Sequence, residues 1–265
     1  GGMSNAAHAK VNVQLNDKLI AATLIDDLQE IKNDFPARAE LAAEVGRALA
    51  DRQDRLVAQA IAMAAMGRRN GRTLAQGDGE IYSGEPAKGG QITFDNETTG
   101  SAGRGLFLDA IYQAASNMDA TNVPEEDRYL AIHPSYFNLL ARNTDVLNKD
   151  WGGAGAFADR VAPRVAGFQV VKTTNIPLTD LSASVTGDKN NLDIDFRDID
   201  NDSTNNDGIY ALAFHKSAAA LITATSIKTE IDYKPEYQGT LVVGSHVMGA
   251  AALRRQSACI ITADD

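Results

Sequence analysis

The chain has 265 residues, of which 44% are hydrophobic and 23% are charged, as in typical globular proteins, so a buried core is expected and disorder is not. The formal net charge is −10, from 35 acidic and 25 basic residues, and the sequence contains no dense basic run. Tight binding to nucleic acid is therefore not expected, because proteins that bind it carry a basic patch that neutralises phosphates.

The N-terminal part of the chain predicts a strand followed by a helix. Val11, Val13 and Leu15 alternate with polar residues, which is the periodicity of a strand over 10–19. Apolar residues spaced by three and four then predict a helix over 21–33. The strand begins almost at the first residue, with no earlier segment to pair with, which indicates that a partner segment has been removed.

A long helix is predicted over about 36–66. Its apolar stripe consists of Leu41, Val45, Leu49, Leu56, Ala60 and Met63. At about 1.5 Å per residue this helix is roughly 45 Å long, well beyond the usual length of about 12 residues. Arg52 lies within the stripe and the heptads are few, which argues against a coiled coil. We therefore expect a spine that lies across a sheet.

The rest of the chain predicts a mixed α/β segment and a strand-rich tail. The expected elements are loops with one hairpin over 67–105, a helix over 106–118, a strand over 129–132, a helix over 135–147 capped by Ser135, a strand over 165–173, a polar insertion over 182–208, a strand over 210–214, a short helix or strand over 217–223, and strands over 227–233, 241–243 and 257–262. The alternation in the tail suggests that it pairs with the early strand.

Two histidines end predicted strands, where α/β proteins often place their sites. An acid–base pair or a metal site at His133 and His215 would need a companion motif such as H-E-x-x-H, which is absent. The glycine-rich runs likewise lack the lysine and hydroxyl residue of a phosphate loop. The interpretation is that both histidines cap strands, that the chain is not an enzyme and that it holds no cofactor.

An acidic run over 188–207 contains alternate aspartates, which could gather a hard cation through oxygen ligands. Aligned with a calcium loop, the run places Ser203 where glycine is required and Ile209 where the closing glutamate belongs. We therefore interpret the run as a solvated loop and predict no metal site.

Cysteine content and hydropathy indicate the compartment. Cys259 is the single cysteine and lies in an apolar run, so it is predicted to be buried and cannot form an internal disulfide. No segment reaches the ~18 apolar residues that a membrane helix needs, and no signal peptide is visible. We expect a protein made in a reducing cytoplasm, without a membrane partner.

Four segments, taken in order along the chain, resemble the major capsid proteins of short-tailed bacteriophages. They are 128–137 (RYLAIHPSYF); 165–171 (VAGFQVV) followed by 175–177 (NIP); 211–218 (ALAFHKSA); and 239–249 (GTLVVGSHVMG) followed by 253–254 (LR). The resemblance implies an α+β fold, the Hong Kong 97-like capsid fold, with a long spine helix and with peripheral and axial domains. Residues 10–103 and 224–265 would form the peripheral domain, with the spine at about 36–66, and residues 104–223 the axial domain.

The resemblance also implies a structural function. Such a subunit would self-assemble as hexamers and pentamers into the icosahedral head of a virion that encloses double-stranded DNA. Its partners would be other copies of itself and the scaffolding and portal proteins of the phage, with packaged DNA held only weakly, and it would be made in the bacterial host cytoplasm. Candidate subunit contacts are the spine residues Arg47, Arg52 and Arg55, and Trp151 and Phe157 in a glycine-rich loop.

Two features depart from the family pattern. The N-terminal arm and the extended loop that family members carry are missing or nearly so, which implies a truncated form with residues 1–9 as a tag scar or a truncated arm. Residues 250–255 (AAALRR) replace a glycine-rich ending with Arg-Pro. Alternative interpretations are a bacterial nanocompartment shell protein that encloses enzymes, a cation-binding surface module, and a hydrolase that uses His133 or His215.

Overall fold

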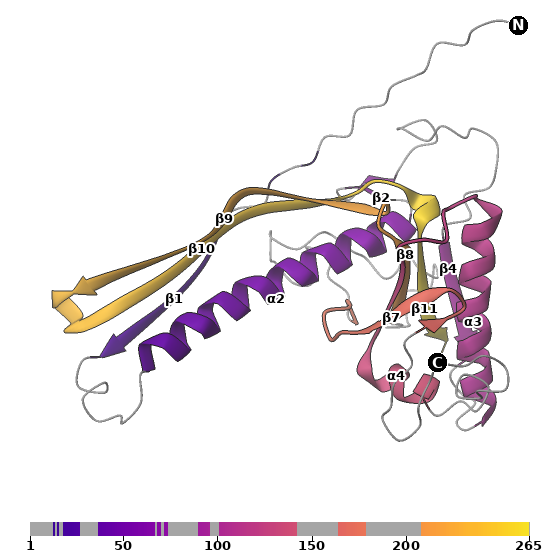
Figure 1. Cartoon of the computed structure of the whole chain (residues 1–265), viewed down its shortest axis with the longest axis horizontal. Coiled ribbons are helices and arrows are strands. Elements are labelled where there is room, and N and C mark those ends of the chain that lie inside the picture. Colours follow the sequence, from indigo (N-terminus) through magenta and orange to yellow (C-terminus); the bar gives the residue numbers. More distant parts are fainter. Residues whose placement is uncertain are drawn as a thin grey trace, which may run out of the picture. The chain divides into compact units, whose positions relative to one another are not determined.

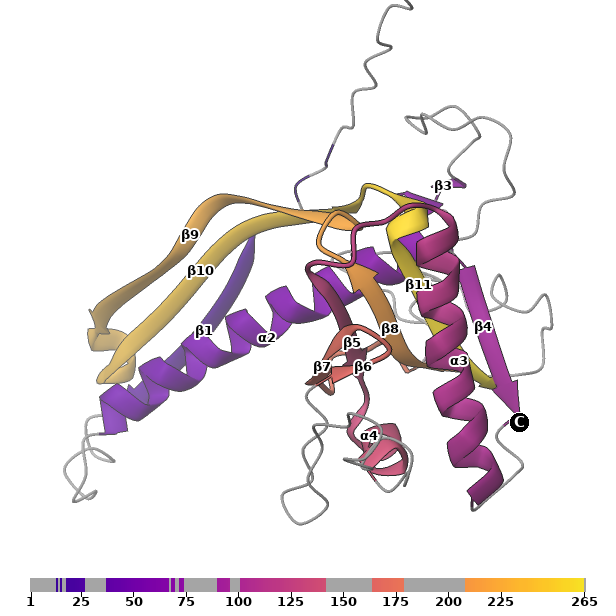
Figure 2. The same cartoon turned by 45° about the vertical axis from the view of Figure 1, so that its right-hand side comes forward.

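The computed structural model describes residues 13, 15, 18–26, 37–66, 68–69, 72–73, 90–95, 101–141, 164–178 and 208–264. The chain forms two compact units, whose elements are labelled in two views in Figures 1 and 2. The larger unit contains residues 57–220 and 251–265, and the smaller unit contains residues 13–56 and 221–250. Both units therefore combine segments that are far apart in the sequence.

The larger unit is built around a six-stranded sheet with the order β4-β11-β8-β5-β7-β6. Its strands are β4 (Gly90–Asp95), β5 (Arg128–Ile132), β6 (Arg164–Val165), β7 (Phe168–Lys172), β8 (Ile209–His215) and β11 (Ala258–Asp264). β5 is parallel to β7 and β11 is parallel to β4, whereas β8 is antiparallel to both β5 and β11. The sheet is thus mixed, with β8 holding β5 and β11 together.

Helices cover both faces of this sheet. α3 (Ser101–Ala120) and α4 (Pro134–Ala141) contribute to one apolar cluster, and the end of α2 (Ala37–Ala65) contributes to the other. Along β11, Cys259 and Ile261 join the α3 cluster, while the alternate residues 258 and 260 join the α2 cluster. A strand buried on both faces reads as a continuous apolar run, which is why this segment shows no polar alternation. The predicted burial of Cys259 is confirmed.

Most elements predicted for this region are present. The helix expected over 106–118 lies within α3, and the strands expected over 129–132, 210–214 and 257–262 correspond to β5, β8 and β11. β4 contains the alternating segment 91–94, and β2 (Arg68–Arg69) pairs with β3 (Arg72–Thr73) as a short hairpin. β4 and β11 come from the ranges that the prediction assigned to a peripheral domain, yet they complete the sheet of the larger unit. The division into peripheral and axial domains stays a prediction.

The strand predicted over 165–173 is confirmed over 168–172 as β7, but its predicted start is wrong, because the chain reverses direction there. β6 and β7 are antiparallel, with Val165 opposite Phe168. Ala166 and Gly167 between them have φ angles of 47° and 84°, the two positive values that a type I′ turn requires. Apolar residues on both sides of the turn concealed it from the analysis of periodicity.

The smaller unit combines a three-stranded sheet, in the order β1-β10-β9, with residues 37–56 of α2. The strands are β1 (Leu19–Asp26), β9 (Ala219–Lys234) and β10 (Gly239–Ala252), and β9 connects to β10 through the 3₁₀ helix η2 (Pro235–Tyr237). A Cβ atom on Gly244 of β10 would lie 2.7 Å from Val45 Cγ1 and 3.0 Å from Leu49 Cδ1. α2 therefore packs closely on this sheet, and the predicted spine helix is confirmed.

The helix predicted over 21–33 is wrong where the structure describes it. β1 pairs antiparallel with β10, from Leu19 opposite His246 to Asp26 opposite Gly239. Leu24 is 46% exposed whereas its neighbour Ile25 is 5% exposed, which is the alternation of a strand. Pairing with β10 outweighs the weak helical spacing. The predicted pairing of an early strand with the C-terminal tail is confirmed, although the described strand lies later than 10–19.

No helix among the described residues is long and apolar enough to cross a bilayer.

Candidate functional site

His215 is the last residue of β8, directly before the turn to β9, and is 6% exposed. Its Nδ1 lies 2.8 Å from Ser217 Oγ and accepts the Ser217 backbone N–H at 3.2 Å, and Ser217 Oγ lies 2.9 Å from Ser257 Oγ. Burial lowers the pKa of the imidazole, and the positive charge of Lys216 lowers it further. The His215–Ser217 contacts are local to the chain reversal, and the Ser217–Ser257 contact ties it to a segment 40 residues later, so this cluster holds the reversal together.

His133 lies at the opposite end of the same strand pair. His215 is opposite Arg128 at the start of β5, whereas His133 directly follows the end of β5. The predicted cap, Ser135, lies inside α4, which begins at Pro134. His133 occupies the capping position instead, because its carbonyl oxygen accepts the Phe137 N–H at 3.0 Å and its Nδ1 accepts the Ser135 N–H at 3.4 Å.

The two histidines therefore do not converge on one site, and the hydrolase interpretation loses the geometry that it required. His133 contacts its own helix, and His215 contacts its own turn. In the part of the chain that the structure describes, no three His, Cys, Asp or Glu side chains gather in a way that could hold a metal ion. The acidic run over 188–207 lies outside the described residues.

Arg128 anchors the connection between α3 and β5, and its side chain is 3% exposed. It donates hydrogen bonds to the carbonyl oxygens of Val123 at 2.5 Å and Pro124 at 2.9 Å, and it forms an ion pair with Asp119 at 2.8 Å. Next to it, Asp127 pairs with Lys216, which lowers the pKa of the Asp127 carboxyl. An arginine directly before an apolar strand was the only sequence signal for this buried anchor.

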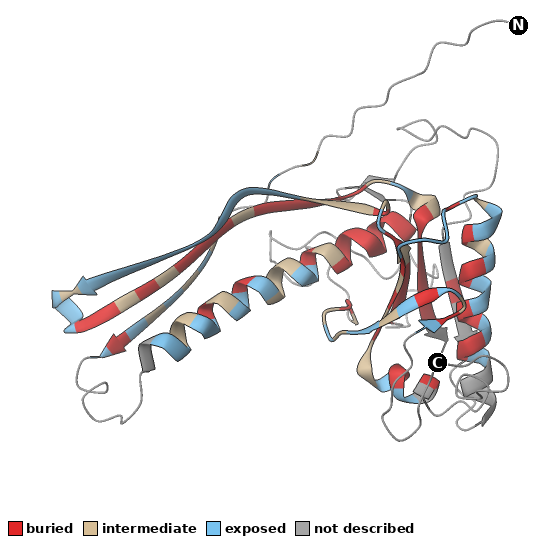
Figure 3. Ribbon diagram, viewed as in Figure 1, coloured by how far each residue is buried: buried red, intermediate tan, exposed pale blue. Residues whose placement is uncertain are grey.

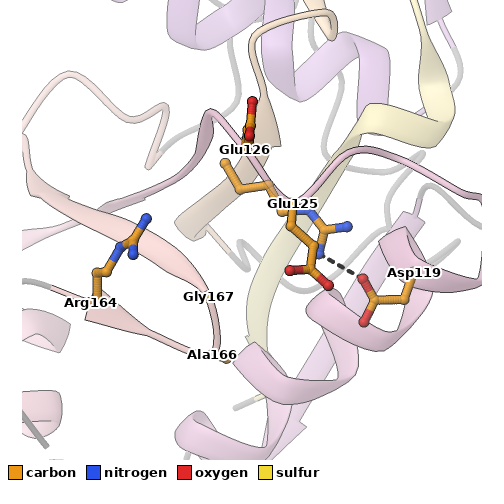
Figure 4. Close-up of a pocket in the computed structure, with 7 residues that line it drawn as sticks. Asp119, Glu125, Glu126, Arg164, Ala166 and Gly167 are labelled. Carbon is orange, nitrogen blue, oxygen red and sulfur yellow. Dashed lines mark ion pairs between the residues drawn. The ribbon is translucent and has the colours of Figure 1, made fainter.

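An open pocket of about 350 Å³ lies beside this anchor. It is lined by Asp119, Glu125, Glu126, Arg128, Arg164, Ala166 and Gly167. Figure 4 shows Arg164 across from Glu125 and Asp119, with the ion pair between Asp119 and Arg128 drawn as a dashed line. Carboxylates and guanidinium groups thus face one opening, which suits ionic contacts more than covalent chemistry.

Two of the three predicted contact residues on the spine, Arg47 and Arg55, have ion-pair partners within α2. Arg47 lies 3.6 Å from Glu44, with 78% and 71% of these side chains exposed. Arg55 lies 2.8 Å from Asp51, with 53% and 46% exposed, and Arg52 is half-buried. Exposed pairs of this kind contribute about 0–1 kcal/mol, so they leave the charges available to other partners. Trp151 and Phe157 lie outside the described residues.

Sequence reasoning predicted a strand over 227–233 but missed its exposure. β9 lies at one edge of its sheet, and residues 222–233 are all exposed, as Figure 3 shows beside the buried β10. Its large apolar side chains include Ile227 at 43%, Ile231 at 64% and Tyr233 at 51% exposure. Edge strands of this length and composition are templates for pairing with another strand. β9 is thus the most extended exposed element of the smaller unit.

Several solved phage capsid structures share this fold. The capsid of the cyanophage P-SCSP1u matches with a TM-score of 0.78 and 29% sequence identity, covering 100% of this chain and 78% of that chain. The mature capsid of bacteriophage PhiM1 matches with a TM-score of 0.71 and 15% identity over 100% and 78%. A structure of Mycobacterium phage Che8 matches with a TM-score of 0.60 and 17% identity over 98% and 76%. The predicted Hong Kong 97-like capsid fold is confirmed.

The family follows from the sequence match. The model of the Gp10A-like major capsid protein family matches residues 3–262, so the chain belongs to this family. It is a structural protein of a bacteriophage capsid, which assembles with copies of itself as a component of the virion. A search of curated proteins gave no match. The comparisons give no support to the truncation, the nanocompartment shell or the cation-binding module.

Proposed function

We propose that the chain forms hexamers and pentamers that close into an icosahedral head around double-stranded DNA. The observation that supports this most is the family match over 3–262, combined with a fold shared with the cyanophage capsid at 29% identity. Closed shells are built from the same contacts repeated by symmetry. In this proposal the chain is made in the bacterial host cytoplasm and assembles there with scaffolding and portal proteins.

The charge of the chain supports a weak hold on the packaged genome. A net charge of −10 repels the phosphate backbone, and binding would need lysine and arginine side chains that release counterions. In this proposal the capsid shell encloses the DNA but binds it only weakly. We also propose that the chain has no catalytic function, since both histidines discussed above have structural contacts.

Three arginines of α2 are proposed as contacts between subunits. Arg47 and Arg55 are largely exposed, and their ion pairs with Glu44 and Asp51 lie within one helix. An acid from a neighbouring subunit can replace such a partner at little cost, because exposed pairs are weak. In this proposal Arg52 joins the same surface, and the loop with Trp151 and Phe157 lies near the centre of each capsomer. Residues 104–223 are proposed as the axial domain, and residues 10–103 with 224–265 as the peripheral domain.

The test is to express the chain with a phage scaffolding protein and to examine the product by electron microscopy. The proposal expects closed particles of uniform size whose surface resolves into rings of five and six subunits. A product that stays monomeric at all concentrations, with and without the scaffolding protein, contradicts it. The triple change Arg47→Ser, Arg52→Ser and Arg55→Ser is expected to lower the yield of particles without unfolding the subunit. An unchanged yield removes the proposed role of these arginines.

A further inference from the structure

One edge of β9 faces away from β10. Among the strands that the structure describes, β9 forms an edge of the sheet β1-β10-β9, with β10 paired to one of its two sides. Successive residues of a strand direct their N–H and C=O groups to alternate sides, so about half of these groups face the free edge. Residues 222–233 are exposed throughout, which leaves this row accessible along the strand. Natural proteins seldom leave such a long apolar edge unpaired.

The two faces of β9 differ in chemistry. Ile227, Thr229, Ile231 and Tyr233 share one face, because side chains alternate along a strand. Lys228, Glu230, Asp232 and Lys234 share the other face. A partner strand that continues the sheet would extend both faces, so it would need apolar residues on one side and complementary charges on the other. β9 itself has both properties.

The charges on β9 select one register for pairing with a second β9. Within one strand, Lys228 lies 2.5 Å from Glu230 and Lys234 lies 2.6 Å from Asp232, which gives the order plus, minus, minus, plus. Antiparallel pairing centred on Ile231 would set each lysine opposite a lysine. Pairing centred on Thr229 sets Lys228 opposite Glu230 at two equivalent places and sets no like charges opposite each other.

The apolar face fits the same register. With Thr229 opposite Thr229 of a second copy, Ile227 lies opposite Ile231, again at two equivalent places. Cross-strand pairs of opposite charge or of apolar side chains each stabilise an antiparallel sheet. A two-fold arrangement is self-complementary, so one surface supplies both halves of the contact.

We propose that β9 pairs antiparallel with β9 of a second copy of this chain, centred on Thr229, and joins two three-stranded sheets into one sheet of six strands. The proposal rests on the proposed assembly into shells and names one of its contacts. The occupant is a second copy because its charges match in this register and because the capsid is built from copies of the same chain.

The first test separates the contact between copies from the ion pair within a strand. Lys228→Glu and Glu230→Lys each break the Lys228–Glu230 pair inside their own chain, and each sets like charges opposite each other in a self-paired edge. An equimolar mixture of the two variants restores opposite charges only between copies. We expect each variant alone to lose particle yield relative to the unchanged chain, and the mixture to recover it.

The second test uses disulfide formation in assembled particles. Thr229→Cys places two thiols opposite each other at the two-fold axis, and oxidation is expected to convert these subunits into covalent dimers. The matched control is Ser226→Cys on the same exposed strand. Its two copies would lie six residues apart along the pair, about 20 Å, too far for a disulfide, which needs Cα atoms within about 7 Å. The native thiol of Cys259 is buried and should not interfere.

The outcomes distinguish this inference from the proposed function. Dimers from Thr229→Cys alone, together with recovery in the mixture, support the pairing. Particles that form normally while Thr229→Cys stays reduced overturn it and assign the edge to another strand or partner, with shell assembly intact. Equal crosslinking of both cysteine variants overturns the register. If the unchanged chain forms no particles under any condition, the proposed function itself fails.

Discussion

The two units of the molecule bury their apolar side chains to different extents. In the larger unit, both faces of the sheet are covered, and Phe107, Phe168 and Leu130 are fully buried. In the smaller unit, α2 packs against β10, while β9 stays exposed along residues 222–233. Apolar burial supplies most of the stabilising free energy of a fold, at about 25 cal/mol per Å². The larger unit can therefore stabilise itself, whereas the smaller unit leaves an apolar edge that, in our proposal, a second copy covers.

This difference suits a subunit of a shell. A unit that leaves a long strand edge exposed is a poor design for an isolated protein, because the edge promotes aggregation. In the proposed pairing of two copies the same edge becomes buried, so its apolar residues would contribute to association rather than to the stability of the subunit.

Removing a large side chain should affect the two units very differently. Phe168→Ala deletes a ring with 0% exposure, and we expect the free energy of unfolding to fall by about 3–5 kcal/mol. Ile231→Ala deletes a side chain that is 64% exposed, and we expect a change within about 0.5 kcal/mol in the unassembled subunit. Urea unfolding measures both. Equal losses at the two positions would show that β9 is packed in the free subunit.

The anchor at Arg128 should be the most costly polar group to remove. Arg128→Met leaves the carbonyl oxygens of Val123 and Pro124 without their donor, and we expect a loss of about 2–3 kcal/mol in urea unfolding. The control is Asp119→Asn, which loses only an ion pair to a carboxylate that is 58% exposed, at about 1 kcal/mol or less. If Asp119→Asn lowers the free energy of unfolding as much as Arg128→Met does, the stabilisation by Arg128 comes from the ion pair and not from the backbone hydrogen bonds.

Two glycines test how closely α2 packs on its sheet. Gly244→Ala puts a Cβ 2.7 Å from Val45 Cγ1 and 3.0 Å from Leu49 Cδ1, and we expect a loss of about 1–2 kcal/mol from overpacking. Gly46→Ala, within α2, meets nothing within 4 Å and should gain up to about 1 kcal/mol from helix propensity. Thermal unfolding measures both. A neutral Gly244→Ala would mean that the helix and the sheet can move apart.

Acid should weaken the turn that His215 holds. Burial and the Lys216, Arg128 and Arg254 charges lower the pKa of His215 below its ordinary value of 6.5, and Asp127 only partly opposes them. As the pH falls below about 6.5, His215 becomes protonated in the unfolded chain before it does in the folded chain. The stabilisation that His215 contributes to the fold is therefore complete above that pH and declines below it. Between pH 8 and pH 5, urea unfolding should show a smaller decline in the free energy of unfolding for His215→Gln than for the unchanged chain. An identical decline in the variant would assign the pH dependence to other groups.

The spine and the core of the larger unit could be predicted from the sequence because their signals are local. The stripe from Leu41 to Met63 identifies α2, and the apolar segments at β5 and β8 read directly as strands. The exposure of β9 could not be predicted, since Ile231 next to charged residues looks like any half-buried strand. Only the position of α2 over β10 shows which strand is left uncovered.

The candidate site was less predictable than the fold. Ser257 lies 40 residues from Ser217, so its contact near His215 depends on the tertiary structure. The sequence gives Arg128 no recognisable role, because its partners are backbone carbonyls that no sequence pattern marks. The strand mistaken for a helix at 21–26 is decided by pairing with β10, more than 200 residues later. Non-local contacts account for each of these differences.

Hydrogen exchange on free subunits and on assembled particles tests the central contrast most directly. We predict that amides of β8 and β11 are protected in both states, because each of these strands is paired on both sides within one subunit. Amides of β9 that face its free edge should exchange rapidly in the free subunit and slowly in particles, while those bonded to β10 change less. If the β9 amides exchange equally in both states, the smaller unit is not completed by its neighbours and the account is contradicted.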